Sequence, residues 1–163
     1  SPVNPELAIG AITEDGLEYL NNPVITALRV DEKYLNDEKN RRLAAVKERL
    51  RLYRRVKEKI PLMGRTVIIT DDGLATGSTM VSAIHAAKAE GASRIIVAVP
   101  GGPADTVAGI SSMEEVSEMV CPVIPEVFYA VSQLYGDFSQ VEDDEVITLL
   151  KEAKGREDEK PHK

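Results

Sequence analysis

One segment, residues 67–79, constrains the fold of this chain more than any other. It opens with the apolar β-branched run Val67-Ile68-Ile69, reaches two adjacent acids at Asp71 and Asp72, and ends in a turn of small and hydroxyl residues. An apolar run without polar alternation is typical of a strand buried on both faces of a parallel sheet. In such sheets ligands bind beyond the carboxyl ends of the strands, which is where the two acids fall. The segment therefore predicts an α/β fold with a ligand site at the end of this strand.

The turn after the acids has the composition of an anion site. Gly73 and Gly77 permit tight backbone geometry, and the hydroxyl residues Thr76, Ser78 and Thr79 lie where a helix begins. Backbone N–H groups and the partial positive charge of a helix N-terminus favour a bound anion. A plain helix cap is the alternative interpretation, but a cap needs one acid or hydroxyl and not this whole spacing. The pattern indicates a site for a phosphate and a sugar.

The chain beyond this turn continues the α/β pattern. Residues 79–90 form an Ala-rich segment predicted to be helical, and residues 94–99 form a second apolar strand. A strand, a helix and another strand predict a βαβ unit with parallel strands and a right-handed crossover. A third parallel strand is expected at residues 118–124. The intervening segment 100–103, Pro-Gly-Gly-Pro, is either a plain turn or a loop that lines the ligand site.

The first 60 residues predict a different kind of structure. Residues 6–12 and 24–30 read as two short strands that pair as an antiparallel flap. Residues 31–60 contain no Gly or Pro and are heavily charged, which predicts one long amphipathic helix. The apolar positions that define its face, three or four residues apart, are Leu43, Val46, Leu50, Tyr53, Val56 and Ile60.

Composition limits the organisation and the partners of the chain. Its 163 residues, 43% of them hydrophobic, suit one domain, placed at residues 1–154 and followed by a solvated tail at 155–163. The 27 acids against 20 bases argue against a nucleic-acid partner, which would need a basic face. Cys121 is the single cysteine, and no apolar run approaches the roughly 18 residues of a membrane span. A cytoplasmic protein without a membrane partner is expected.

The two acids, the three residues after them and Thr76-Gly77-Ser78-Thr79 closely resemble the phosphoribosyl pyrophosphate (PRPP) signature of type I phosphoribosyltransferases. The resemblance implies a parallel sheet flanked by helices, and an enzyme that transfers the phosphoribosyl group of PRPP to a nitrogenous acceptor with release of pyrophosphate. It implies that Asp71 and Asp72 hold the ribose, directly or through Mg²⁺, and act in catalysis by position and charge. It places the 5′-phosphate in the turn formed by Ala75, Thr76, Gly77, Ser78 and Thr79, and it includes Gly73 among the residues that bind PRPP.

The resemblance extends over nearly the whole chain. Residues 4–11, 128–140 and 143–150 are similar to a group of predicted phosphoribosyltransferases that end in an aromatic-Ala-Val segment, a Tyr-x-Asp-Phe element and a final helix. The resemblance implies that Phe128 or Tyr129 stacks on an acceptor base. The alternative is a small hydrophobic cluster that packs the last helix.

Two departures from the family pattern bear on catalysis. The sequence contains no Arg-Gly-Gly loop, which in the family grips pyrophosphate, and Ala75 stands where purine-salvage members carry an acid that accepts a proton. Because the Arg-Gly-Gly loop is absent from the sequence, a non-catalytic module that binds PRPP or a nucleotide for regulation is the alternative function, and Ala75 argues against a purine-salvage enzyme. Arginines of the segment 31–60 either form a solvated face or reach the leaving pyrophosphate. An interaction piece whose long helix docks on another chain is a third hypothesis, and self-association is expected because strands and helix would expose apolar surface.

Overall fold

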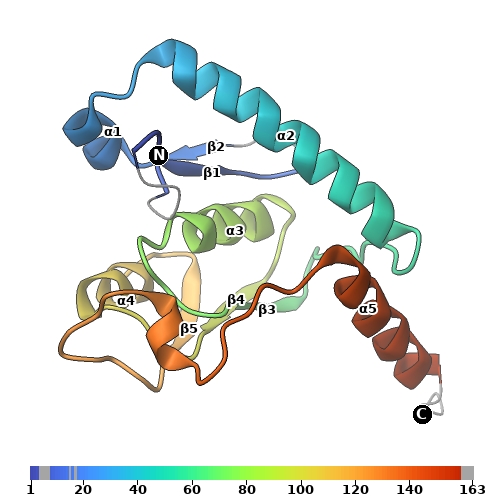
Figure 1. The fold of residues 1–163 in the computed structure, drawn as a ribbon. Coiled ribbons are helices and arrows are strands. Elements are labelled where there is room, and N and C mark those ends of the chain that lie inside the picture. Colours follow the sequence, from blue (N-terminus) through green and yellow to red (C-terminus); the bar gives the residue numbers. More distant parts are fainter. Residues whose placement is uncertain (4–7, 15, 17, 159–163) are drawn as a thin grey trace.

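A parallel sheet of three strands forms the centre of the computed structural model, which describes residues 1–3, 8–14, 16 and 18–158, with side chains through residue 155 (Figure 1). The strands β3 (Thr66–Thr70), β4 (Arg94–Ala98) and β5 (Val116–Val120) lie in that order. The predicted α/β fold is confirmed. The third strand begins two residues before the predicted segment 118–124 and ends at Val120, and an isolated bridge joins Val123 to Gly101 beyond it.

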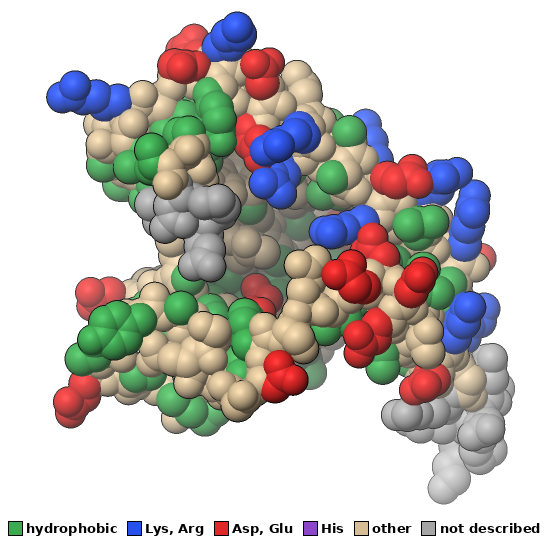
Figure 2. All heavy atoms as spheres, viewed as in Figure 1, with side chains coloured by type: hydrophobic (Ala, Val, Ile, Leu, Met, Phe, Trp, Pro, Cys, Tyr) green, Lys and Arg blue, Asp and Glu red, His purple; other side chains and the backbone are tan. Residues whose placement is uncertain are grey.

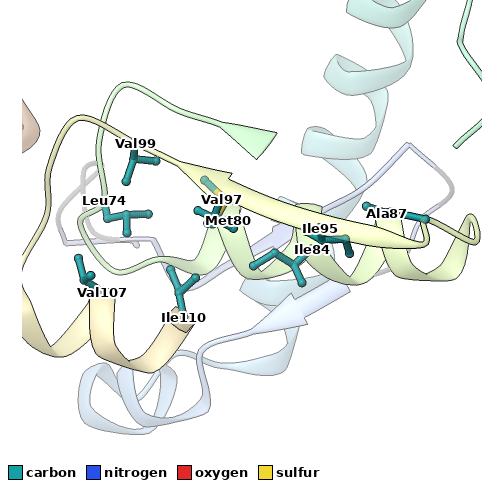
Figure 3. Packing of buried hydrophobic residues seen from close by; sticks show 10 residues of the cluster. Leu74, Met80, Ile84, Ala87, Ile95, Val97, Val99, Val107 and Ile110 are labelled. Atoms are coloured by element: carbon teal, nitrogen blue, oxygen red, sulfur yellow. The ribbon is translucent and has the colours of Figure 1, made fainter. Parts of the chain in front are cut away.

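Two helices cover one face of this sheet. Helix α3 (Ser78–Ala89) links β3 to β4, and helix α4 (Ala104–Ser111) links β4 to β5. Because both crossovers run in the same direction across the sheet, right-handed connections bring both helices to the same side. Figure 3 shows their side chains meeting those of β4 in one cluster. This core consists of Leu74, Met80, Ile84, Ala87, Ala92, Ile95, Val97, Val99, Val107 and Ile110.

The opposite face of the sheet is open. Ile68 on β3 is 62% exposed and Val120 on β5 is 44% exposed. The prediction that residues 67–69 are buried on both faces is therefore wrong: β3 is an edge strand that packs only Val67 and Ile69 against the core. β-Branched residues favour a strand on an exposed face as well as on a buried one, so the apolar run does not distinguish the two cases.

A two-stranded antiparallel flap precedes the sheet, as predicted, but its second strand is not the predicted one. Strand β1 (Gly10–Ile12) pairs with β2 (Glu18–Leu20), whereas the segment 24–30 lies mostly in helix α1 (Asn22–Leu28). Asn21 caps this helix by accepting a hydrogen bond from the N–H of Val24 at 3.3 Å, and Pro23 lies in its first turn. These start signals override the strand propensity of the β-branched residues that follow. Residues 6 and 7 of the predicted first strand lie outside the described residues.

The long helix α2 (Glu32–Arg54) crosses above the flap, and the flap in turn packs on α3 (Figure 1). Asp31 caps α2 by accepting from the N–H of Tyr34 at 2.7 Å. The helix ends six residues before the predicted end at residue 60, in a turn where the carbonyl of Tyr53 accepts from the N–H groups of Val56 and Lys57. None of its 23 residues is buried.

Two further elements complete the chain. A 3₁₀ turn η1 (Val131–Leu134) follows β5, and helix α5 (Asp143–Asp158) contacts α2. Residues 155–158 are thus helical, although the sequence predicts a solvated tail from residue 155. The remaining residues 159–163 lie outside the described part of the chain.

Candidate functional site

The two acids and the turn after them line one pocket at the carboxyl end of β3. This pocket, about 310 Å³ in volume, is formed by the segment 71–80 together with Ala8 and Val131. The structure brings together all eight residues that the sequence predicts to bind ribose and phosphate. They are Asp71, Asp72, Gly73, Ala75, Thr76, Gly77, Ser78 and Thr79.

The turn leads directly into the first turn of α3. Gly77 precedes the helix with φ at +74°, a conformation that favours glycine, and an added Cβ would lie 2.9 Å from Cγ2 of Thr106. Gly77 has no side chain to cap this helix, and the N–H of Ser78 donates to Oγ1 of Thr76 at a long 3.5 Å. In the described structure, the next N–H groups of the first turn, those of Thr79 and Met80, remain available to a bound anion. The hydroxyls of Thr76 and Ser78 lie 3.2 Å apart beside them.

Among the described residues, the negative charge of the two acids has no basic side chain paired with it. In the described part of the chain, no Lys or Arg forms an ion pair with Asp71 or Asp72. Atoms crowded around the Asp71 carboxyl desolvate it and raise its pKa, although the residue as a whole is exposed and the N–H of Asp72 donates to its Oδ1 at 3.0 Å. Carboxylate pairs of this kind suit ribose hydroxyls, or a Mg²⁺ ion that takes its remaining ligands from a substrate.

The loop after β4 supports the acid-bearing loop from one side. The N–H of Leu74 donates to the carbonyl of Gly101 at 2.9 Å, and a Cβ added to Gly102 would lie 2.7 Å from Cβ of Leu74. The hydroxyl of Thr106 donates to the carbonyl of Ala75 at 3.0 Å. None of residues 100–103 is among the described residues that line the pocket. The Pro-Gly-Gly-Pro segment is therefore a supporting loop that lets two backbones approach closely.

The segment around η1 supports the loop from another side, and sequence reasoning assigned it no such role. The hydroxyl of Tyr135 donates to the carbonyl of Asp72 at 2.6 Å. A Cβ added to Gly73 would lie 2.8 Å from Cγ1 of Val131, which also lines the pocket. The Tyr-x-Asp-Phe element contains Tyr135, but no sequence pattern predicts a hydrogen bond to a backbone carbonyl 63 residues away.

The other predicted contacts lie away from this pocket. Neither Phe128 nor Tyr129 is among its described lining residues, and Tyr129 is 87% exposed. Their stacking on an acceptor stays a prediction. On α2, Arg41 and Arg42 pair with Glu38, and neither lines the pocket formed by the described residues.

A family model described as a phosphoribosyl transferase domain matches residues 21–125 of this chain. The chain belongs to this family. The match covers the sheet, α2, α3 and the whole acid-bearing turn. The segment 71–80, which forms most of the pocket wall of this phosphoribosyl transferase domain, therefore lies inside the matched region, whereas Ala8 and Val131 lie outside it.

Relatives with the same description cover nearly all of this phosphoribosyl transferase domain. Two Mycobacterium tuberculosis proteins, from strains CDC 1551 / Oshkosh and H37Rv, are each 41% identical over 152 residues and named "Putative phosphoribosyl transferase". The match covers 93% of this chain but 34% of each relative, so the chain spans about a third of their length. The crystal structure of TT1426 from Thermus thermophilus matches 93% of this chain and 71% of that one, with a TM-score of 0.69 and 36% identity. Among the described helices, none has the length and apolar character to cross a membrane.

Proposed function

We propose that this domain binds PRPP in the acid-lined pocket and transfers its phosphoribosyl group to a nitrogenous acceptor. The observation that carries the proposal is the meeting, in one pocket of about 310 Å³, of two carboxylates without an ion-pair partner among the described residues and a helix N-terminus whose Thr79 and Met80 N–H groups are available. An anion and a polyhydroxyl group joined in one molecule satisfy both features. The family and the relatives support a transferase of this class.

The residues of the pocket have separate roles in this proposal. The N–H groups at the start of α3 and the hydroxyls of Thr76 and Ser78 bind the 5′-phosphate, and Asp71 and Asp72 hold the ribose. The same two acids would hold Mg²⁺, which neutralises pyrophosphate charge when bound. The acceptor nitrogen forms a bond to C1 of the ribose as the bond from C1 to pyrophosphate oxygen breaks. The electron pair leaves with pyrophosphate, and the proton of the nitrogen passes to water. The acids lower the barrier through position and charge.

Exchange of both acids for amides tests the pocket. PRPP with Mg²⁺ should raise the unfolding temperature of the wild-type chain, because a ligand that binds only the folded state stabilises it. The variant Asp71→Asn with Asp72→Asn should lose that protection. Asp37→Asn with Asp105→Asn removes two carboxylates outside the pocket and should keep it. If PRPP protected both double variants equally, the assignment of this pocket as the PRPP site would be wrong.

A regulatory module that binds PRPP without transfer is the second candidate, and Ala75 favours it. This residue brings no proton acceptor to the loop, so the acceptor nitrogen must lose its proton without help from that position. Pyrophosphate release from PRPP, Mg²⁺ and a panel of nitrogenous bases should be measured beside a direct PRPP titration. Binding together with release supports the enzyme, and binding without release across the panel supports the module.

Self-association of the chain is a further part of the proposal. The open face of the sheet exposes Ile68 and Val120, and a parallel sheet is ordinarily covered on both faces. Sedimentation of the chain at several concentrations should therefore show a dimer or a larger species. A monomer at every concentration would contradict this expectation.

A further inference from the structure

A second and larger cavity lies between helix α2 and the β1–β2 flap. Its volume is about 690 Å³, in the range of small-molecule sites. Figure 2 shows the molecule hollowed between the part built on α2 and the part that carries the sheet. Apolar side chains line this groove from both sides, among them Ile9 and Leu20 of the flap region and Leu35 and Val46 of α2.

The groove continues into the acid-lined pocket. Ala8 and Thr79 line both cavities, and Thr79 is the last residue of the turn that would bind phosphate. A molecule in the groove and a molecule in the pocket would therefore meet at this point. This continuity places the groove where a second substrate could approach the first.

The charges on the groove wall argue against an anionic occupant. The wall carries three bases, Lys39, Arg42 and Arg49, and three acids, Glu18, Glu32 and Glu38. Each base already has a carboxylate partner: Lys39 pairs with Glu18 at 3.0 Å, Arg42 with Glu38 at 2.6 Å, and Arg49 with Asp143 at 3.4 Å. A phosphate or carboxylate would have to displace one of these partners.

The exposure of helix α2 also favours an uncharged occupant with an apolar body. Helix α2 presents a row of apolar side chains, yet none of its residues is buried. An amphipathic helix is normally stabilised by burial of its apolar face. An uncharged apolar body in the groove would supply that burial without disturbing the ion pairs on the wall.

We propose that this groove binds the acceptor, and that the acceptor is an uncharged amine or N-heterocycle with a substantial apolar body. Its nucleophilic nitrogen lies where the groove opens into the acid-lined pocket and points toward the ribose held by Asp71 and Asp72. This inference rests on the proposed function, because it names the class of the second substrate of the same reaction.

Three probes test the class of ligand in the absence of PRPP. They are 1-aminonaphthalene, 1-naphthoate with the same rings but a carboxylate, and adenine, which lacks the apolar body. Titration calorimetry should show saturable binding of 1-aminonaphthalene at neutral pH and at least tenfold weaker binding of the other two. Methyl resonances of Leu35 and Val46 should shift on binding. Tighter binding of 1-naphthoate or adenine would overturn the proposed class, and shifts confined to Ile68 and Val127 on the exposed apolar surface would overturn the location.

Two neighbouring alanines of α2 provide a matched pair of variants. Ala44 and Ala45 are both exposed, but only Ala45 lines the groove. Ala45→Glu places a charge in the groove and should weaken 1-aminonaphthalene binding at least tenfold, whereas Ala44→Glu should leave it within twofold. Circular dichroism should show that both variants keep their helix content. If 1-aminonaphthalene bound both variants equally, the groove would not be its binding site.

Failure of this inference can be separated from failure of the proposed function. Protection of the wild-type chain by PRPP and Mg²⁺ tests the pocket alone. Protection without groove binding of the amine leaves the proposed function standing and overturns the groove as the acceptor site. The absence of protection, even with groove binding, overturns the transfer reaction and with it the role of the groove.

Discussion

The acid-bearing loop and the long helix α2 line two adjoining cavities that share Ala8 and Thr79, yet they are held in opposite ways. The loop contains Leu74 and Ser78, each 1% exposed, and close contacts leave no room for a side chain at Gly73 or Gly77. Helix α2 buries none of its residues. Its apolar residues are at most half-buried, and polar contacts such as the hydrogen bond from Tyr53 to Asp143 at 2.6 Å join it to the rest of the chain.

This difference in packing corresponds to the two substrates of the proposed reaction, because the loop binds the phosphoribosyl donor and α2 lines the acceptor groove. Packing fixes the loop before any ligand arrives, and a preformed site loses little entropy on binding. The helix is less constrained, because regions with few buried apolar contacts open at low free-energy cost. We therefore expect the phosphoribosyl half of the site to be rigid and the acceptor half to adapt to its ligand.

Truncation of one leucine in each region gives the largest expected contrast. Leu74→Ala should lower the free energy of unfolding by about 2–5 kcal/mol, because it leaves a cavity in the core. Leu43→Ala on α2 should cost about 1 kcal/mol or less, because Leu43 is only half-buried and loses less apolar contact. Urea unfolding of both variants measures these values. Equal losses would show that the helix is packed as tightly as the loop.

A methyl group added to the loop tests its rigidity directly. Gly77→Ala forces a side chain into a positive-φ conformation and against Thr106, so we expect a loss of about 1–3 kcal/mol in stability and of PRPP protection. Gly109→Ala in α4 is the control, because no atom lies within 4 Å of its added Cβ and helix propensity favours alanine there. That variant should be as stable as the wild type or more stable. Full PRPP protection of Gly77→Ala would contradict a fixed loop.

The loop could be predicted from the sequence because its determinants are local. A strand, two acids and a glycine that starts a helix lie within 14 residues, and the same short segment forms the pocket. The flap was only partly predictable. There the cap at Asn21 and the neighbouring Pro23 act against the strand propensity of the residues after them, and the pattern alone does not rank the two.

Long-range features escaped prediction for a physical reason. The exposure of Ile68 depends on the side of the sheet to which both crossover helices turn, and the support of Asp72 by Tyr135 depends on where the chain returns after β5. Neither has a periodicity that a sequence pattern can reveal. The groove beneath α2 is also a product of tertiary packing, because its two walls come from segments that do not pair with each other.

Removal of one tyrosine hydroxyl from each region is a smaller test of the same difference, because Tyr135 and Tyr53 form hydrogen bonds of equal length. Tyr135→Phe removes the 2.6 Å bond to the carbonyl of Asp72, and Tyr53→Phe removes the 2.6 Å bond to Asp143. Each should cost about 0.5–1.5 kcal/mol of stability. Only Tyr135→Phe should also weaken PRPP binding, by several-fold in a direct titration, because it releases the acid-bearing loop. An equal effect of both variants on PRPP affinity would show that the bond to Asp72 does not position the loop.

The smallest expected effects are changes in stability with pH. At neutral pH, a substitution in the loop should raise the free energy of unfolding, and one near the end of the helical region should lower it. Desolvation raises the pKa of Asp71 above its unfolded value, so this residue costs stability as pH rises through about 4. Asp71→Asn should therefore be more stable than the wild type at neutral pH, and the difference should vanish in acid.

At the end of the helical region, a hydrogen bond from Lys59 holds the pKa of Glu14 below its usual range. The resulting stability is present at neutral pH and is lost as pH falls through the lowered pKa. Lys59→Met removes the ion pairs of Lys59 with Glu14 and with Glu90 and should thus be less stable than the wild type at neutral pH, by less than about 1 kcal/mol because solvent screens these partly exposed pairs. Urea midpoints measured between pH 3 and pH 7 compare the two variants. If both variants were less stable than the wild type at neutral pH, the ionised carboxylate of Asp71 would not destabilise the fold. The acids of the loop would then be stabilised by neighbouring groups, as Glu14 is by Lys59.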